Sequence, residues 1–138
     1  MTGELVYLDS SAIVKLTVAE PESVALFAWL ADHPGHVTSA LARMEVRRAL
    51  RRAGATAAAL RRATSVLEAI AAVPVDRAVI EAAGELDPPE LRSLDAIHLA
   101  TALSVGADLA GIVTYDERLA AAAVRARLEV WAPGAEAG

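Results

Sequence analysis

Residues 5–9, LVYLD, followed directly by residues 10–20, SSAIVKLTVAE, are the stretch that indicates the fold of this chain. LVYLD is short, apolar and partly β-branched or aromatic, as is typical of a buried strand. Ser10 and Ser11 can then cap a helix over the next apolar run. A buried strand that passes at once into a helix is the repeating unit of parallel α/β sheets.

The same pattern continues along the chain. Breaks at Pro34–Gly35, at Gly54 and at the loop DPPE (87–90) separate the elements. Thr38 or Ser39 can cap one helix and Ser93 another. Further strands are expected at 36–39, 73–76, 109–116 and 128–131, with helices over 21–33, 40–52, 56–72, 77–85, 94–106 and after Asp116. The alternation predicts an α/β fold with a mostly parallel sheet covered on both faces.

Length and composition narrow the class of protein. A chain of 138 residues with 55% apolar residues predicts one domain, 1–133, followed by a short tail, 134–138. The absence of Cys excludes a disulfide framework and a thiolate metal site. The N-terminus has no basic and then apolar segment, and no apolar run approaches the ~20 residues that a membrane span needs. We therefore expect a soluble, cytoplasmic protein that does not associate with a membrane.

Charge is distributed unevenly. The formal net charge of −5 argues against broad affinity for nucleic acids. Residues 43–62, however, carry seven arginines and the single acid Glu45, so this segment is strongly basic. Such a segment is either a solvated helix face or a surface that contacts phosphates.

Four acidic residues stand out because they lie at the ends of apolar runs or inside one: Asp9, Glu45, Asp95 and Asp116. Acids in such places are costly unless they are paired or bind a metal. Each also has an ordinary explanation. Asp9 and Asp116 can cap helices, Asp95 suits a first helical turn, and Glu45 can pair with Arg48 at i+3. Their separations of 36, 50 and 21 residues match no local ligand spacing, so the pattern does not show that they converge.

Convergence of these acids would have a definite chemical consequence. Several carboxylates in contact cannot all stay ionised without a cation, and oxygen ligands favour Mg²⁺ or Mn²⁺ over Zn²⁺. A cation there could acidify water and neutralise charge on a phosphodiester. Ser11 and Thr114 could support such a water or metal, or they could be plain capping and strand-end hydroxyls. His98 could orient Asp95, although a buried neutral histidine is the more common arrangement.

With these residues identified, the chain closely resembles the PIN-domain ribonucleases, and within them the VapC-type toxins of prokaryotic toxin–antitoxin systems. The resemblance covers nearly the whole chain. It rests on LVYLDSSAIVKL (5–16), TSALARMEV (38–46), LRSLDAIHLATAL (91–103) and VTYDERL (113–119) in this order. It implies a single-domain three-layer α/β/α sandwich with an acidic pocket at the strand ends.

The resemblance also implies an activity and partners. The family's four acids match Asp9, Glu45, Asp95 and Asp116, and its hydroxyl residues match Ser11 and Thr114. The implied activity is Mg²⁺- or Mn²⁺-dependent endonucleolytic cleavage of a structured RNA, such as tRNA or rRNA, by metal-activated water. The implied partners are a VapB-type antitoxin that blocks the acids and a second copy in a homodimer. Arginines near Glu45 would then contact RNA phosphates: Arg43, Arg47, Arg48, Arg51 and Arg52.

Two alternatives remain from the residues alone. An aspartyl-phosphate domain also places an Asp at a strand end. It needs either a late Lys or a second Asp two residues after the first, whereas this chain has only Lys15 and carries Ser11 at that second position. The other alternative is a non-catalytic α/β module that binds RNA or a partner and whose carboxylates are only helix caps.

Overall fold

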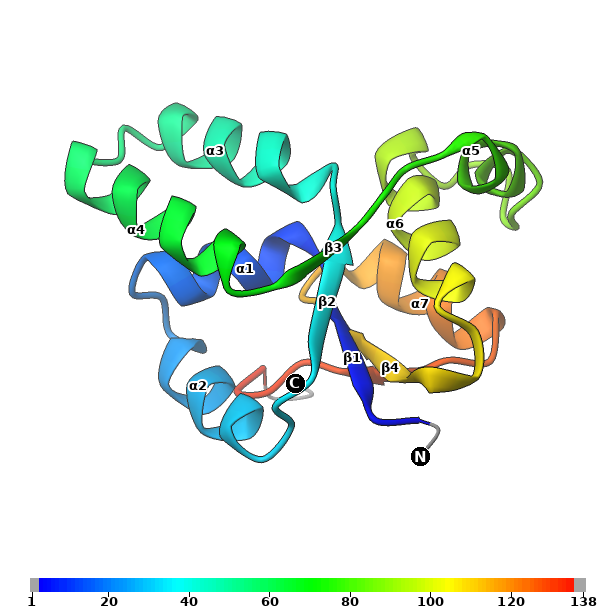
Figure 1. Ribbon diagram of the computed structural model, residues 1–138, viewed down its shortest axis with the longest axis horizontal. Helices are drawn as coiled ribbons and strands as arrows, with labels where there is room; N and C mark the ends of the chain where they lie inside the picture. The colour runs from blue at the N-terminus through cyan, green and yellow to red at the C-terminus, as the bar shows by residue number, and fades with distance from the viewer. Residues whose placement is uncertain (1–2, 136–138) are drawn as a thin grey trace.

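The computed structural model describes residues 3–135. Its core is a five-stranded sheet in which every pairing is parallel, as the alternating pattern predicts (Figure 1). The α/β fold class is confirmed. The strands are β1 (Leu5–Leu8), β2 (His36–Ser39), β3 (Ala71–Val73), β4 (Leu109–Val113) and β5 (Glu129–Trp131).

The order of the strands, β3-β2-β1-β4-β5, creates a switch point in the middle of the sheet. The chain moves outward from β1 through β2 to β3, and then returns to place β4 on the other side of β1. Leu8 pairs with Val113, so the residues that follow these two strands emerge next to each other. In open parallel sheets, ligands bind beyond the carboxyl ends of the strands at such a switch point.

Helices cover both faces of the sheet. The elements α1 to α4 lie on one side and α5 to α7 on the other (Figure 1). Successive residues of β1 point to opposite faces: Val6 and Leu8 pack in one buried core, and Tyr7 packs in the other. The predicted three-layer α/β/α arrangement is confirmed. The helices are α1 (Ser10–Thr17), α2 (Ser23–Ala31), α3 (Ala42–Arg52), α4 (Ala57–Glu68), α5 (Arg77–Gly84), α6 (Ser93–Ser104) and α7 (Glu117–Arg125), with a short 3₁₀ turn at Gly106–Asp108.

The third strand is the element that the sequence pattern misplaced. The expected helix over 56–72 ends at Glu68, and the strand expected at 73–76 lies instead at Ala71–Val73. Alanine has the highest helix propensity, so an Ala-rich stretch favours a helix, yet here its backbone pairs with β2 at the edge of the sheet. Pro74 cannot extend the pairing, and Asp76 caps α5 through the N–H of Val79 at 2.9 Å.

Several expected helix caps also differ. Asp9 rather than Ser10 or Ser11 caps α1. Neither α3 nor α6 has a side-chain cap, so Thr38, Ser39 and Ser93 do not serve as predicted. Ser39 Oγ accepts a hydrogen bond from the N–H of Leu41 just before α3, at 3.0 Å.

Two remaining expectations concern the ends and the membrane. Gly134 and Ala135, at the start of the expected tail, form a turn closed by the N–H of Ala135 and the carbonyl of Ala132 at 2.9 Å. The rest of the expected tail, 136–138, lies outside the described residues. Within 3–135 no helix combines the length and the apolar character that a membrane crossing requires.

Candidate active site

All four acids stand at the carboxyl-terminal edge of the sheet. Asp9 directly follows β1, and Asp116 follows β4 by three residues. Glu45 lies in the first turn of α3, which begins after β2. Asp95 lies in the first turn of α6, the helix that runs back across the sheet to the start of β4. The α/β topology therefore brings together residues that are far apart in the sequence.

Asp9 is buried and fully engaged by neutral donors. Its Oδ1 accepts hydrogen bonds from Ser11 Oγ at 2.6 Å and from the N–H of Ala12 at 3.0 Å. Its Oδ2 accepts one from Thr114 Oγ1 at 2.5 Å. Burial raises the pKa of Asp9, and these three donors and His98 oppose that shift without cancelling it. A carboxylate with only neutral direct donors thus remains costly to ionise.

Asp116 is joined to Asp9 through Thr114. The N–H of Asp116 donates to Thr114 Oγ1 at 3.1 Å, and that hydroxyl donates in turn to Asp9. Asp116 also caps α7, because its Oδ1 accepts from the N–H groups of Arg118 at 2.9 Å and Leu119 at 3.0 Å. Asp9 and Asp116 therefore do cap helices, as their ordinary explanation predicted. The two caps lie side by side at the switch point.

Glu45 has a different environment. Its Oε1 accepts from Ser10 Oγ at 2.7 Å and pairs with Nε2 of His98. Burial acts to raise the pKa of Glu45, but the His98 hydrogen bond and charge, together with Ser10, outweigh it and lower the pKa. The expected ion pair with Arg48 is absent from the pairs formed within 3–135.

His98 is the member of the site whose role the sequence did not predict. Its side chain is 2% exposed. Nδ1 lies 2.7 Å from the hydroxyl of Tyr7 on β1, while Nε2 faces Glu45 and lies 3.3 Å from Ser10 Oγ. The expected partner, Asp95, is not among its hydrogen-bond partners in the described part of the chain.

Asp95 is subject to the charges of the other three acids and of His98. Burial raises its pKa, and the negative charge of Asp116 raises it further. Asp9 and Glu45 contribute in the same direction, whereas His98 lowers the pKa. Asp95 therefore lies close enough to the other three acids for their charges to raise its pKa.

The donor set fits an oxygen-preferring divalent cation. All four charged groups are carboxylates, and a cation among them would relieve the repulsion that raises the pKa of Asp95. As the side chains stand between residues 3 and 135, no group of three or more His, Asp or Glu is arranged to enclose an ion. Both oxygens of Asp9 and one oxygen of Glu45 are instead held by protein donors.

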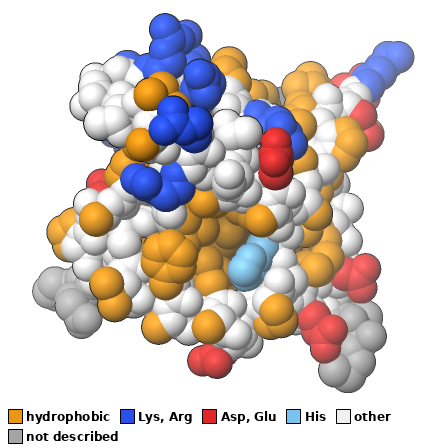
Figure 2. Space-filling view, turned by 60° about the vertical axis from the view of Figure 1, so that its left-hand side comes forward, with side chains coloured by type: hydrophobic (Ala, Val, Ile, Leu, Met, Phe, Trp, Pro, Cys, Tyr) orange, Lys and Arg blue, Asp and Glu red, His pale blue; other side chains and the backbone are white. Residues whose placement is uncertain are grey.

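The arginines form a separate surface on the helical pair α3 and α4. Positively charged side chains gather over these helices at the top of Figure 2, above a band of apolar side chains. Among the ion pairs formed within 3–135, none involves an arginine of α3. Arg47 and Arg61 line a hollow between α3 and α4. The five α3 arginines, Arg43, Arg47, Arg48, Arg51 and Arg52, are all exposed.

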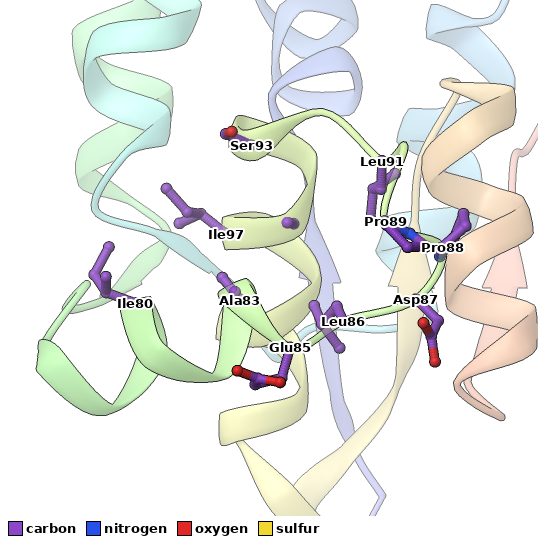
Figure 3. Close-up of a pocket in the computed structure, with 12 residues that line it drawn as sticks. Ile80, Ala83, Glu85, Leu86, Asp87, Pro88, Pro89, Leu91, Ser93 and Ile97 are labelled. Carbon is purple, nitrogen blue, oxygen red and sulfur yellow. The ribbon is translucent and has the colours of Figure 1, made fainter.

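A larger pocket lies away from the acids. It has a volume of about 520 Å³ and is formed by the end of α5, the loop over 85–91 and the outer side of α6 (Figure 3). Ser93 and Ile97 line it, but the acid of the same helix, Asp95, does not. Pocket size therefore does not identify the acidic site in this fold, whereas the position of the acids at the switch point does.

Sequence reasoning did not place Ser10 or Tyr7 in the site, and it gave His98 a different partner, Asp95. Ser10 was expected only to cap a helix, and Tyr7 only to belong to a buried strand. Tyr7 is 91 residues from His98, and Ser10 is 35 residues from Glu45, so no local spacing connects either pair. The available signal was the parallel topology, which places the end of β1 beside the first turns of α3 and α6.

Comparisons with known proteins agree with this geometry. Residues 6–125 match the PIN domain family. The chain is 52% identical over 129 residues to ribonuclease VapC46 of Mycobacterium tuberculosis, covering 93% of this chain and 97% of that relative. Ribonuclease VapC35 of the same species is 43% identical over 134 residues, covering 94% of this chain and 98% of the relative.

Solved structures show the same fold at lower sequence identity. The crystal structure of M. tuberculosis VapC20, described as a sarcin-ricin loop cleaving toxin, aligns with a TM-score of 0.69 at 21% identity, covering 85% of this chain and 94% of that one. The M. tuberculosis structure VapBC-5, a member of the VapBC family of toxin–antitoxin systems, aligns with a TM-score of 0.60 at 20% identity, covering 92% and 97%. From its switch-point acids, its fold and its sequence relatives, this chain belongs to the PIN domain family and, within it, to the VapC-type ribonucleases.

Proposed function

We propose that this protein is a divalent-metal-dependent endoribonuclease toxin, whose metal ligands and catalytic groups are Asp9, Glu45, Asp95 and Asp116. The observation that carries the proposal is the electrostatic coupling of the four acids. Burial raises the pKa of Asp95, and the negative charges of Asp116, Asp9 and Glu45 raise it further. A stable fold alone gives no reason to gather four carboxylates at a switch point.

The four acids would hold Mg²⁺ or Mn²⁺. Such a cation supplies charge neutralisation and makes water a stronger acid. The protein's own contribution is orientation: Ser11 and Thr114 fix the carboxylate of Asp9. Thr114 also links Asp9 to the backbone of Asp116, so these two acids keep a fixed relation. Ser11 and Thr114 would thus support a bound water or metal only indirectly, by orienting the acids.

The exposed arginines on α3 would contact the RNA backbone. Arg48 and Arg52 follow Glu45 at i+3 and i+7 and so share its side of the helix, and Arg47 and Arg51 form the adjacent row. Contacts of this kind give affinity and position the phosphate near the acids, but they do not read sequence. The substrate class we propose is a structured RNA, such as tRNA or rRNA, in the cytoplasm; the relative VapC20 is described as cleaving the sarcin-ricin loop.

The proposed partners follow from the relatives. VapBC-5 is described as part of a toxin–antitoxin system. We propose that a VapB-type antitoxin blocks the acids of this chain and that the toxin forms a homodimer. Neither partner is needed for the chemistry of a single site.

The test is RNA cleavage by the purified protein, with Asp95→Asn as the variant. The parent should cut RNA in Mn²⁺ or Mg²⁺ and stop in EDTA, and Asp95→Asn should lose cleavage while its circular dichroism spectrum stays unchanged. Glu85→Gln, on an exposed acid away from the four, is the matched control and should cut at the parental rate. Cleavage by Asp95→Asn at the parental rate, or activity in EDTA, would favour a non-catalytic binding module or a contaminating nuclease.

A further inference from the structure

We propose that His98 is a positioning residue, which together with Ser10 holds Glu45 by its Oε1 and leaves Oε2 as the oxygen available to a divalent cation. The proposal deepens the function proposed above and rests on it. It concerns a hydrogen-bonded group in which Tyr7 and His98 are buried and Ser10 and Glu45 are partly buried. None of its members besides Glu45 was assigned to the cation.

The direction of each hydrogen bond follows from the acceptor character of Glu45. An ionised carboxylate can only accept, so both Ser10 Oγ and His98 Nε2 donate to Oε1. The same N–H is 3.3 Å from the Ser10 oxygen, which can share it. Two donors on one oxygen restrict rotation of the carboxylate about its last bond.

Tyr7 fixes the histidine in turn. In the tautomer that carries its proton on Nε2 and donates it to Glu45, Nδ1 is an acceptor, so the buried phenol of Tyr7 donates to Nδ1 over 2.7 Å. The rings of Tyr7 and His98 are also in edge-to-face contact, with an interplanar angle of 76°. Because Tyr7 belongs to the central strand and is itself fully buried, the imidazole is anchored to the middle of the sheet.

The arrangement is that of an outer partner which orients a metal ligand. Groups of this kind fix the direction of the ligand, and their removal typically costs roughly 10- to 100-fold in metal affinity or activity. A purely structural histidine would satisfy Tyr7 equally well and would not need a carboxylate on its other nitrogen. The bond to Glu45 is the contact that a positioning role requires.

A matched pair of variants separates them. The amide nitrogen of glutamine lies near the position of histidine Nε2, so His98→Gln keeps a donor toward Glu45. The amide of asparagine lies near Nδ1, so His98→Asn keeps a partner for Tyr7 and loses the donor to Glu45. Mn²⁺ affinity, measured by isothermal titration calorimetry on the folded metal-free proteins, should weaken roughly 10- to 100-fold in His98→Asn and severalfold at most in His98→Gln.

Two further measurements make the result decisive. Ser10→Ala, which removes only a hydroxyl, should weaken Mn²⁺ binding severalfold. This variant tests the positioning of Glu45 if a His98 variant does not fold. In a Glu45→Gln background, His98→Asn should add no further loss of Mn²⁺ affinity, because its effect passes through Glu45.

The outcomes separate this inference from the proposed function. If the parent protein binds Mn²⁺ and His98→Asn and Ser10→Ala bind it equally well, His98 is structural and the positioning role is wrong, while the nuclease assignment stands. Equal losses in His98→Asn and His98→Gln would also overturn it. If the parent neither binds Mn²⁺ nor cleaves RNA, the proposed function itself fails.

Discussion

Asp9 and Glu45 belong to the same cluster of acids, yet their surroundings shift their pKa values in opposite directions. Asp9 comes from the sheet, is fully buried and receives hydrogen bonds from two hydroxyls and one backbone N–H. Its pKa is raised because burial exceeds what those donors supply. Glu45 comes from a helix and receives a histidine N–H, and its pKa is lowered although burial opposes this. Hydroxyl and backbone donors orient the buried carboxylate of Asp9, whereas the histidine beside Glu45 also favours the ionised form of that acid.

The difference divides the site into a sheet-borne half and a helix-borne half. In the sheet-borne half, Thr114 joins Asp9 and Asp116 through hydrogen bonds of 2.5 and 3.1 Å. In the helix-borne half, His98 lowers the pKa of Glu45, whereas burial and the neighbouring acids raise that of Asp95. Separate acids and bases in one site are commonly recognised by environments that shift their pKa values apart.

The largest expected effect is common to both halves. Asp9→Asn and Glu45→Gln should each lower the rate of RNA cleavage by roughly 1000-fold or more, since each removes a charged ligand from a cation that supplies several kcal/mol. Single-turnover cleavage of an end-labelled RNA in Mn²⁺ measures this. A Glu45 variant that cuts normally while Asp9→Asn is inactive would confine the chemistry to the sheet-borne half.

The next effect concerns RNA affinity and belongs to the helix-borne half alone. In an Asp95→Asn background that prevents cleavage, Arg47→Ala with Arg51→Ala should reduce the slope of log K against log salt by about 0.7 to 0.9 for each phosphate that is no longer neutralised. Arg77→Ala is the control, because this arginine is exposed on α5 and pairs with Glu81. An unchanged slope in the double variant would remove these two arginines from the RNA surface.

Without metal, variants of Asp9 and Glu45 should change the free energy of unfolding in opposite directions. In EDTA, Asp9→Asn should raise the free energy of unfolding by about 1 kcal/mol, because a neutral amide of the same shape replaces a poorly compensated buried charge and still caps the helix. Glu45→Gln should lower it by about 1 kcal/mol, because a charge-assisted bond to His98 becomes a neutral one. Urea unfolding followed by circular dichroism measures both. Equal signs for the two variants would refute the contrast drawn between the acids.

The smallest effect is the pH dependence of that contrast. Because the pKa of Asp9 is raised in the folded state, protonation of Asp9 stabilises the fold. This contribution is complete below the unfolded-state pKa of 3.8, and it is lost as the pH rises through the folded-state pKa. The advantage of Asp9→Asn should therefore shrink as pH falls from 7.5. The lowered pKa of Glu45 works the other way, so the deficit of Glu45→Gln should persist until the pH falls below the ordinary value of 4.5. Unfolding free energies of the three proteins across this range, in EDTA, check both trends.

The sequence pattern predicted the part of the fold that hydrophobic runs determine. LVYLD and the strand predicted at 109–116 are mostly apolar and bounded by turns, so the positions of β1 and of the start of β4 follow from local chemistry, although β4 ends at Val113, three residues earlier than predicted. The edge strand β3 does not follow from it, because its Ala-rich residues prefer a helix and only pairing with β2 makes them extended.

The sequence predicted the site to a similar extent. The acids are visible as charges at the ends of apolar runs, and the family resemblance indicated the four positions. The partner of each acid was not visible, because partners are decided by packing across layers. Arg48, a close neighbour of Glu45 in sequence, was the expected partner, whereas the actual one is His98 on another helix, 53 residues away. Local spacing reports only neighbours along one helix, and this site is built from the ends of several elements.

The central claim is that these four acids together bind one divalent-metal centre at the switch point between β1 and β4. A crystal of the protein grown with Mn²⁺ tests it most directly, through a difference map calculated from the anomalous scattering of manganese. We predict a strong peak within coordinating distance of carboxylate oxygens from Asp9 and at least one of Glu45, Asp95 and Asp116. A map without a peak in that region at saturating Mn²⁺, or with manganese bound only elsewhere, would contradict the account.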